Sequence, residues 1–422
     1  MLINKLINNK FYFYGFFLLI WLCVQLLSNN LQYTLNPAFE TEDASSYLDG
    51  AKALLTGNYP WFRAVGYPFI LAPFLGIFGK SFTLIFFTIT QCLLWLAIVR
   101  LIHSIIKIWR NDEKLALLGS ALYAVFISPI LYTNHLLTET VYTYLLILSV
   151  FLFSKYLNDK TFKHVYWIFP ILAFSALVRP VGLYIFYASI PLAFFVFQHS
   201  FKKTIIFFFA SITLLVSHLF LMYSFHGTAQ MCLSKNLAIN FYLIPEIINY
   251  PDMNKSTYIQ NHIDGLQKEI KPFENHPKQY KLVDSMIDSK NKVIFHNTSL
   301  YPIIKILYVN FKDELAEGYN NYGVKKWARK TSGYQHITIF IILIIGIISG
   351  VFNHILDKRK PNLLIFLFVL LGVIGFFSLA SSIVFWYGDR LHLPFYPIIV
   401  ILLCLCLPPR RNKTQSNDKV QY

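Results

Sequence analysis

The loop at residues 29–81 carries side chains that could perform acid–base chemistry beside an anionic group. Asp43 follows Glu42 after a polar stretch, and Arg63 stands later in the same loop, ahead of a Gly-Tyr-Pro turn. A carboxylate can act as a general base, and a guanidinium suits a phosphate better than an ammonium does. The alternatives are a helix N-cap for Asp43 and an interfacial, snorkelling side chain for Arg63. We favour Asp43 as the base and expect Glu42 to be dispensable.

Further acids and arginines recur between apolar runs later in the chain. Glu139 begins an apolar run, where an acid also interacts favourably with a helix dipole, so both interpretations stay open. Arg179 lies in the turn between two apolar runs, and an arginine at membrane depth usually has an anionic partner. Asp389 and Arg390 are adjacent, and a local ion pair explains them most simply.

The composition is that of an integral membrane protein. Of 422 residues, 56% are hydrophobic, 18% aromatic and only 14% charged. The net charge of +16 comes from short basic clusters between apolar runs, which the positive-inside rule explains, so nucleic-acid binding is not expected. The 5 cysteines have neither a disulfide framework nor a metal-ligand spacing.

The apolar runs predict an all-α fold, a polytopic transmembrane bundle of about ten spans, since a span needs about 20 apolar residues. The first run lacks a small-residue cleavage site and is interpreted as a retained span. The segment from Tyr67 to Phe78 is too short to span and predicts an interfacial or re-entrant helix. The expected spans are 11–28, 82–106, 115–134, 137–154, 165–178, 181–199, 204–223, 335–352, 362–384 and 392–407.

A second short helix is expected in the first outer loop, ahead of this segment. Tyr47, Ala51 and Leu54 return to one face at helical spacing, and Gly57 is a natural end. Two buried polar residues within spans, Gln91 and His218, are expected to form interhelical hydrogen bonds rather than to bind a ligand.

Basic residues in the short connections predict the orientation. If the N-terminus is cytoplasmic, that side receives most of the lysines and arginines, and the opposite side receives few. The outer face then carries Asp43, Arg63, Glu139, Arg179 and the pair Asp389–Arg390.

Four regions follow from this orientation. We expect a catalytic transmembrane module at 1–223, an extracytoplasmic insertion at 224–334, C-terminal transmembrane helices at 335–407 and a cytoplasmic tail at 408–422. Within the insertion, the run from Leu300 to Leu315 mixes apolar residues with lysines, which is typical of an interfacial amphipathic helix.

Taken in order, these motifs resemble the GT-C superfamily of polytopic glycosyltransferases, most closely the group of protein O-mannosyltransferases and lipid A aminoarabinose transferases. The resemblance covers roughly residues 11–200 and the last two spans. Two departures concern the sugar and the acceptor: the aminoarabinose transferases usually have Lys-Pro-Pro in the stretch that begins at Arg63, and many relatives have Asp at the place of Glu139. The motifs are Asp43-x-x-x-Tyr47, Gly57, Arg63-x-x-Gly66-Tyr67-Pro68, Thr138-Glu139, Val178-Arg179-Pro180 and Arg390-x-x-x-Pro394-x-x-Pro397.

The resemblance implies a multi-pass enzyme of the plasma (inner) membrane that takes a sugar from a polyprenyl-phosphate-linked donor on the extracytoplasmic face, with inversion. Asp43 would be the catalytic base and Glu139 a second acid that orients the acceptor, which would be a glycan, a lipid or a protein. No cofactor is implied, and nothing in the sequence supports a divalent metal. The residues that the resemblance assigns to substrate binding are Arg63, Tyr67, Arg179 and Arg390.

Two other classes share the hydropathy. An O-antigen or polysaccharide polymerase or ligase also has many spans and a large outer loop, but its essential arginines would be expected in that loop. Here the loop is lysine-rich, with Arg329 as its one arginine. A lipid or sugar transporter would more often have charges deep within its spans or paired broken helices, and the sequence has neither clearly.

Overall fold

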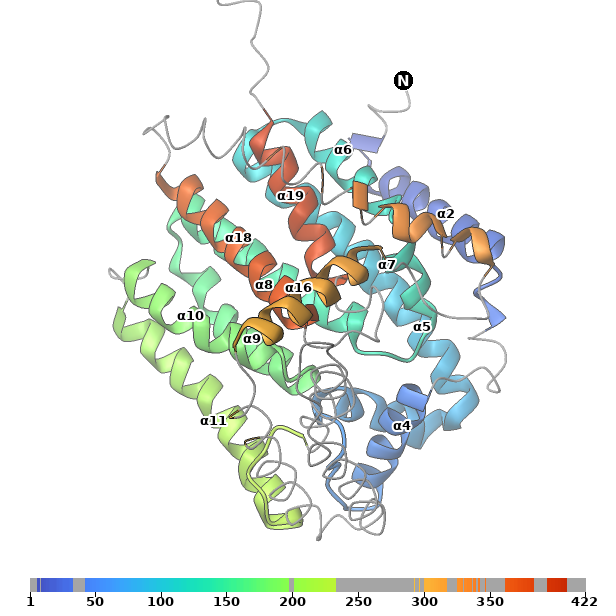
Figure 1. Ribbon diagram of the computed structural model, residues 1–422, viewed down its shortest axis with the longest axis vertical. Coiled ribbons are helices and arrows are strands. Elements are labelled where there is room, and N and C mark those ends of the chain that lie inside the picture. The colour runs from blue at the N-terminus through green and yellow to red at the C-terminus, as the bar shows by residue number, and fades with distance from the viewer. Residues whose placement is uncertain are drawn as a thin grey trace, which may run out of the picture.

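The protein is an all-helical, polytopic bundle in the part of the chain that the structure describes (Figure 1). This computed structural model describes residues 9–32, 42–196, 201–232, 300–316, 361–382 and 393–407, together with residues 6 and 7 and scattered positions between 292 and 346. Every helix and 3-10 turn assigned in these ranges confirms the expected fold class, and no strand occurs among them. Arg390 and most of the insertion lie outside the described residues.

Five described helices are long and apolar enough to cross a membrane, and a bent pair makes up to six. The bent pair is α6 (Glu113–Ala124) with the segment Ile127–Asn134, which consists of α7 (Ile127–Leu131) and η2 (Tyr132–Asn134), at an angle of 68°. The five are α2 (Lys10–Ser28), α5 (Gly66–Arg110), α8 (Glu139–Asp159), most of α11 (Phe201–His226) and most of α18 (Pro361–Ser382).

Three further apolar helices occupy expected spans but are shorter. They are α9 (Val165–Val178), α10 (Gly182–Val196) and α19 (Tyr396–Cys406), the last preceded by η9 (Leu393–Phe395). The 14 residues of α9 are about 21 Å long, whereas the hydrocarbon core is about 30 Å thick. The expected span at 335–352 lies mostly outside the described residues, so ten spans stay a prediction.

The long helix α5 is two helices that fold back on each other at Gly79. Gly79 has φ 71° and ψ 178°, a conformation that only glycine adopts readily. Residues 12 apart in a straight helix are about 18 Å apart, yet the ring centroids of Phe74 and Phe86 are 4.4 Å apart. Tyr67 likewise contacts Phe87. The segment from Tyr67 to Phe78 is thus a separate short helix, as the sequence predicted.

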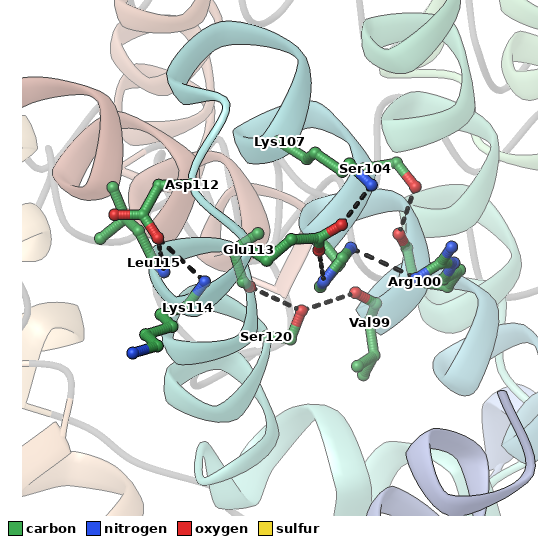
Figure 2. A network of polar contacts seen from close by, with 11 residues as sticks. Val99, Arg100, Ser104, Lys107, Asp112, Glu113, Lys114, Leu115 and Ser120 are labelled. Atoms are coloured by element: carbon green, nitrogen blue, oxygen red, sulfur yellow. Dashed lines mark hydrogen bonds and ion pairs between the residues drawn. The ribbon is translucent and has the colours of Figure 1, made fainter. Parts of the chain in front are cut away.

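The other end of α5 is joined to α6 by a polar turn (Figure 2). Glu113 forms an ion pair with Lys107, and its Oε2 lies 3.2 Å from His103 Nε2. Asp112 caps α6, because its Oδ1 accepts hydrogen bonds from the backbone N–H groups of the next turn at 2.9 and 3.0 Å. Ser120 Oγ donates to the Val99 carbonyl at 3.1 Å. These contacts explain why the two helices pack antiparallel.

The helix ends fall on two faces of the bundle, as the charge pattern predicted. At one face, Arg110 donates to the Leu405 carbonyl at the end of α19, and Lys160 lies 3.2 Å from Asn362 at the start of α18. At the other face, His226 at the end of α11 contacts the Tyr59 carbonyl, just after α4 (Glu42–Leu55). In Figure 1 α6 lies at one end of the view and α4 at the opposite end. Which compartment each face meets stays a prediction.

Part of the insertion packs on the bundle. The expected amphipathic helix is α16 (Leu300–Ala316), and it contacts α18. Ile306 and Asn310 are buried on it, while Tyr301 and Tyr308 are exposed. The helix is confirmed, although its placement at a membrane interface and the boundaries of the four regions stay predictions.

Candidate active site

Asp43 and Arg63 form an ion pair at the start of α4. The helix begins at Glu42, so Asp43 lies inside its first turn, and its carboxylate contacts the guanidinium. Arg63 Nε also donates to Ser46 Oγ at 3.0 Å. The side chains of Arg63 and Asp43 are 21% and 16% exposed, so the pair is partly shielded but open to a ligand.

The ring of Tyr47 fixes the guanidinium of Arg63 from the helix side. The Arg63 guanidinium carbon lies 5.5 Å from the Tyr47 ring centroid and 5.0 Å from that of Phe62, both within the range of a cation–π contact. Tyr47 belongs to the helix face predicted from the sequence, and Ala51 on the same face is fully buried. The apolar face of α4 therefore packs inward while its first turn holds the charged pair.

A glycine allows α4 to approach the start of α5. A Cβ at Gly50 would lie 2.9 Å from a ring carbon of Pro68 and 3.3 Å from one of Pro60. Contacts this short do not occur between real side chains, so only glycine fits without a shift. The approach places Tyr47 beside Tyr67, with ring centroids 5.0 Å apart in an edge-to-face arrangement.

The second acid–arginine pair joins α8 to the end of α9. Glu139 is the first residue of α8 and Arg179 follows the last residue of α9. Arg179 Nη2 lies 3.7 Å from Glu139 Oε1, a charge contact rather than a hydrogen bond. Each charge also suits its helix end, since acids are favourable at N-termini and cations at C-termini. Glu139 is 1% exposed, which makes the arginine its charge partner within the bundle.

Tyr67 connects the two pairs. Its ring contacts Tyr47, which lies under Arg63, and it interacts electrostatically with Glu139. The preceding residue, Gly66, lies against the backbone of Leu177 and Val178, because a Cβ there would be 2.6 Å from the Leu177 carbonyl carbon. The start of α5 thus touches the chain immediately before Arg179. Contacts therefore run from Asp43 through Arg63 and Tyr47 to Tyr67, while the backbone next to Tyr67 lies against the residues just before Arg179, the ion-pair partner of Glu139.

Buried hydrogen bonds hold the segment before Glu139. Gln91 Nε2 donates to the His135 carbonyl at 2.6 Å, and Trp21 Nε1 donates to Thr133 Oγ1 at 2.8 Å. Gln91 thus forms a structural hydrogen bond as expected, but to the connection between η2 and α8 and not to a second helix. Further hydrogen bonds from α2 and the residues after it complete this network. Gln25 is bonded to Ile130, Thr133, Asn30 and Asn134. Asn30 is also bonded to Leu131 and Asn134.

Hydrogen bonds also hold the loop that carries Arg63. Tyr59 Oη lies 2.6 Å from His218 Nδ1, and His218 Nε2 lies 2.9 Å from the Met231 carbonyl. The second contact requires a proton on Nε2, so in neutral His218 Nδ1 accepts from Tyr59. Burial raises the pKa of Tyr59 to about 12, which keeps its hydroxyl protonated. His218 is a hydrogen-bonding residue as expected, but its partners lie in two connections and not in a second helix, so it joins the loop that carries Arg63 to α11.

Sequence reasoning missed two polar side chains at these pairs. Ser46 lies three residues after Asp43, and Tyr142 lies three residues after Glu139. Residues three apart on a helix share a face, so the spacing was a usable signal. Tyr142 is fully buried and interacts electrostatically with Arg179. Among the described residues, no group of three or more His, Cys, Asp or Glu side chains is placed to hold a metal ion.

Comparison with known proteins gives a likeness among solved structures. No protein-family model and no curated protein matches the sequence. The structure is similar to that of the archaeal oligosaccharyltransferase AglB from Archaeoglobus fulgidus, solved in complex with an inhibitory peptide and a dolichol-phosphate, at 11% identity and a TM-score of 0.41. The match covers 93% of this chain and 50% of AglB, so the chain spans half the length of that protein. A likeness at this score does not identify an activity. Any proposal about activity therefore rests on the side chains of the site.

Proposed function

We propose that the protein is a membrane glycosyltransferase that moves a sugar from a polyprenyl-phosphate-linked donor to an acceptor on the extracytoplasmic face, with inversion at the anomeric carbon. The observation that carries the proposal is the connected pair of acid–arginine contacts, Asp43–Arg63 and Glu139–Arg179, at one end of an apolar bundle. Such a site offers a base and two cations beside a hydrocarbon phase. A donor with an isoprenoid tail and a phosphate head has the matching parts.

The arginines suit the phosphate of the donor. Each guanidinium lies in a partly enclosed position, 21% exposed for Arg63 and 16% for Arg179, where charge interactions are stronger than in bulk water. A phosphate that enters would share these guanidinium groups with the carboxylates. As the sugar–phosphate bond breaks, negative charge grows on the leaving phosphate, and cations already in place stabilise that charge in the transition state.

Asp43 acts as the base in this scheme. It takes the proton from the acceptor's hydroxyl or other nucleophilic group while that atom forms a bond to the anomeric carbon. The bond from the anomeric carbon to the phosphate oxygen breaks on the opposite side, and the electron pair leaves with the polyprenyl phosphate. One attack from the opposite side inverts the anomeric configuration. Glu139, whose carboxylate is fixed by Arg179, orients the acceptor or assists the base.

The deciding experiment is mass analysis of surface glycans, glycolipids and glycoproteins from cells with and without the protein. Loss of one sugar from one acceptor, restored by the wild-type chain and not by Asp43→Asn, is the expected result. A change in polymer length with every sugar retained would indicate a polymerase or ligase. Accumulation of the intact donor on the cytoplasmic side of the membrane would indicate a transporter.

A further inference from the structure

Two fully buried tyrosine hydroxyls close to the Glu139–Arg179 pair have no hydrogen-bond partner among the described residues. They belong to Tyr67 and Tyr142, which are each 0% exposed. Two other buried aromatic side chains toward this face do have partners: Trp21 Nε1 donates to Thr133, and Tyr59 Oη is bonded to His218.

The two hydroxyls approach the pair from different elements. Tyr67 begins the first helix of α5, contacts Tyr47 and Phe87, and interacts with Glu139. Tyr142 stands one turn along α8 from Glu139, packs edge-to-face on Phe377 of α18 and interacts with Arg179. The two tyrosines therefore lie near the acid–arginine pair on two different elements: Tyr67 at the start of α5, whose first residue lies against the chain just before Arg179, and Tyr142 three residues after Glu139 on α8.

A phenylalanine would fill either position without burying an unpartnered polar group. Such a group is costly because it loses its hydrogen bonds to water and gains none. A hydroxyl at both positions is therefore best explained by a ligand that satisfies it. A phenol both donates and accepts a hydrogen bond, as the hydroxyl groups of a sugar do. A sugar hydroxyl can therefore use both functions of the phenol, whereas a phosphate oxygen that only accepts uses one.

We propose that Tyr67 and Tyr142 form the subsite that binds the hydroxyl groups of the transferred sugar. The inference rests on the proposed function and deepens it, because it assigns the phosphate to the arginines and the sugar ring to the tyrosines. The sugar is bonded directly to the phosphate, so a phosphate held by Arg179 brings the sugar within reach of Tyr142.

The test measures the contribution of the sugar to binding separately from that of the phosphate. Full-length protein in lipid nanodiscs is titrated with a short-chain polyprenyl phosphate and with its glucosyl, galactosyl, mannosyl and aminoarabinosyl forms. The ratio of dissociation constants, bare phosphate over glycosyl phosphate, reports the sugar contacts. The variants are Tyr142→Phe and Tyr67→Phe, with Tyr123→Phe as the matched control, since Tyr123 is 1% exposed in α6 and packs on Trp95.

We expect the wild type to bind at least one glycosyl phosphate more tightly than the bare phosphate. Tyr142→Phe should lower the ratio of the two dissociation constants by about three- to tenfold, which corresponds to the loss of one hydrogen bond. The affinity for the bare phosphate should not change, and Tm should not fall, because the removed hydroxyl has no protein partner. Tyr123→Phe should leave the ratio unchanged.

Three results would overturn the assignment. An unchanged ratio in both Tyr67→Phe and Tyr142→Phe would mean that the hydroxyls contact only water. A wild type that binds no glycosyl form more tightly than the bare phosphate would mean that the sugar makes no contacts. Loss of bare-phosphate binding in Tyr142→Phe would place the phosphate at Tyr142 instead. In these cases the proposed function still stands, whereas a wild type that binds neither bare nor glycosyl phosphate removes both proposals.

Discussion

At the scale of single residues, the site is a set of charges whose neighbours set their geometry. Ser46 and Tyr47 orient Arg63, and Arg179 neutralises a glutamate that is almost fully buried. The same acids could serve only stability, as ion pairs between helices. Substitutions that preserve shape and change one chemical property separate the two roles.

Asp43→Asn should remove transfer activity while the protein remains folded. The amide keeps the size and can still accept a hydrogen bond from Arg63, but it cannot take a proton, so we expect a loss of about a hundredfold to ten-thousandfold in rate. The measurement is release of polyprenyl phosphate by purified protein. Asp49→Asn is the matched control, because Asp49 lies on the same helix and its side chain is 69% exposed. If Asp43→Asn retains most activity while Glu42→Gln or Glu139→Gln does not, the base lies at one of those acids.

Arg63→Lys should be only a partial substitute for the wild type. Lysine keeps the charge but cannot donate to Ser46 and bind a phosphate through a planar fork at the same time. Donor affinity measured in nanodiscs should therefore fall in the order wild type, Arg63→Lys, Arg63→Ala. Lys52→Ala serves as the control, since Lys52 is exposed and pairs with Asp49. Wild-type affinity in Arg63→Ala would contradict a phosphate contact.

Arg179→Ala should lower the stability of the fold as well as donor binding. Removal of one partner from a buried pair leaves an uncompensated charge, which typically costs about 3–5 kcal/mol. The double variant Arg179→Ala with Glu139→Gln removes that charge and should regain part of the lost Tm, but not donor affinity. A double variant that is no more stable than Arg179→Ala would show that Glu139 does not depend on the arginine.

At the scale of elements, two close approaches assemble the site: α4 against Pro68, and the start of α5 against the end of α9. The sequence predicted the helix face of α4, its end near Gly57 and the break after Phe78, because helical spacing and glycine are local signals. Local signals of this kind did not predict which acid forms an ion pair with which arginine. Asp43 and Arg63 are 20 residues apart, and the second pair joins two different helices, so both contacts depend on how helices pack.

Gly66→Ala should reduce activity by separating these elements. The new Cβ would lie 2.6 Å from the Leu177 carbonyl carbon and 2.7 Å from Val178 N, both backbone atoms that cannot rotate away. Relief requires a shift of α5 relative to α9, which moves Tyr67 away from the end of α9. Overpacking of this kind typically costs about 1–3 kcal/mol. Transfer rate and Tm are the measurements.

Gly15→Ala is the control, since a Cβ at Gly15 has nothing within 4 Å. It should leave the transfer rate and Tm at wild-type values or slightly raise Tm, because alanine favours a helix more than glycine does. Wild-type activity in Gly66→Ala would show that the contact between α5 and α9 does not position the site.

At the scale of the whole molecule, the fold class followed from composition, whereas the number of spans stays a prediction. The expected span at 165–178 is present as α9, but α9 is shorter than a helix that crosses a membrane alone, and much of its surface is buried against other helices. The two-faced arrangement was predictable from basic residues. Lys107, Arg110, Lys155 and Lys160 lie near helix ends on the face opposite α4, which the positive-inside rule assigns to the cytoplasm.

Single-cysteine labelling tests that orientation directly. Asn58, after α4, and Asn158, at the end of α8, are exposed on opposite faces. In a chain without its five native cysteines, Asn58→Cys should react with a membrane-impermeant maleimide on intact cells, and Asn158→Cys only after the membrane is permeabilised. The reason is that the cytoplasmic face carries the excess of lysine and arginine. Labelling of Asn158→Cys alone on intact cells would place Asp43, Arg63, Glu139 and Arg179 in the cytoplasm, where the donor and the acceptor would have to be sought instead.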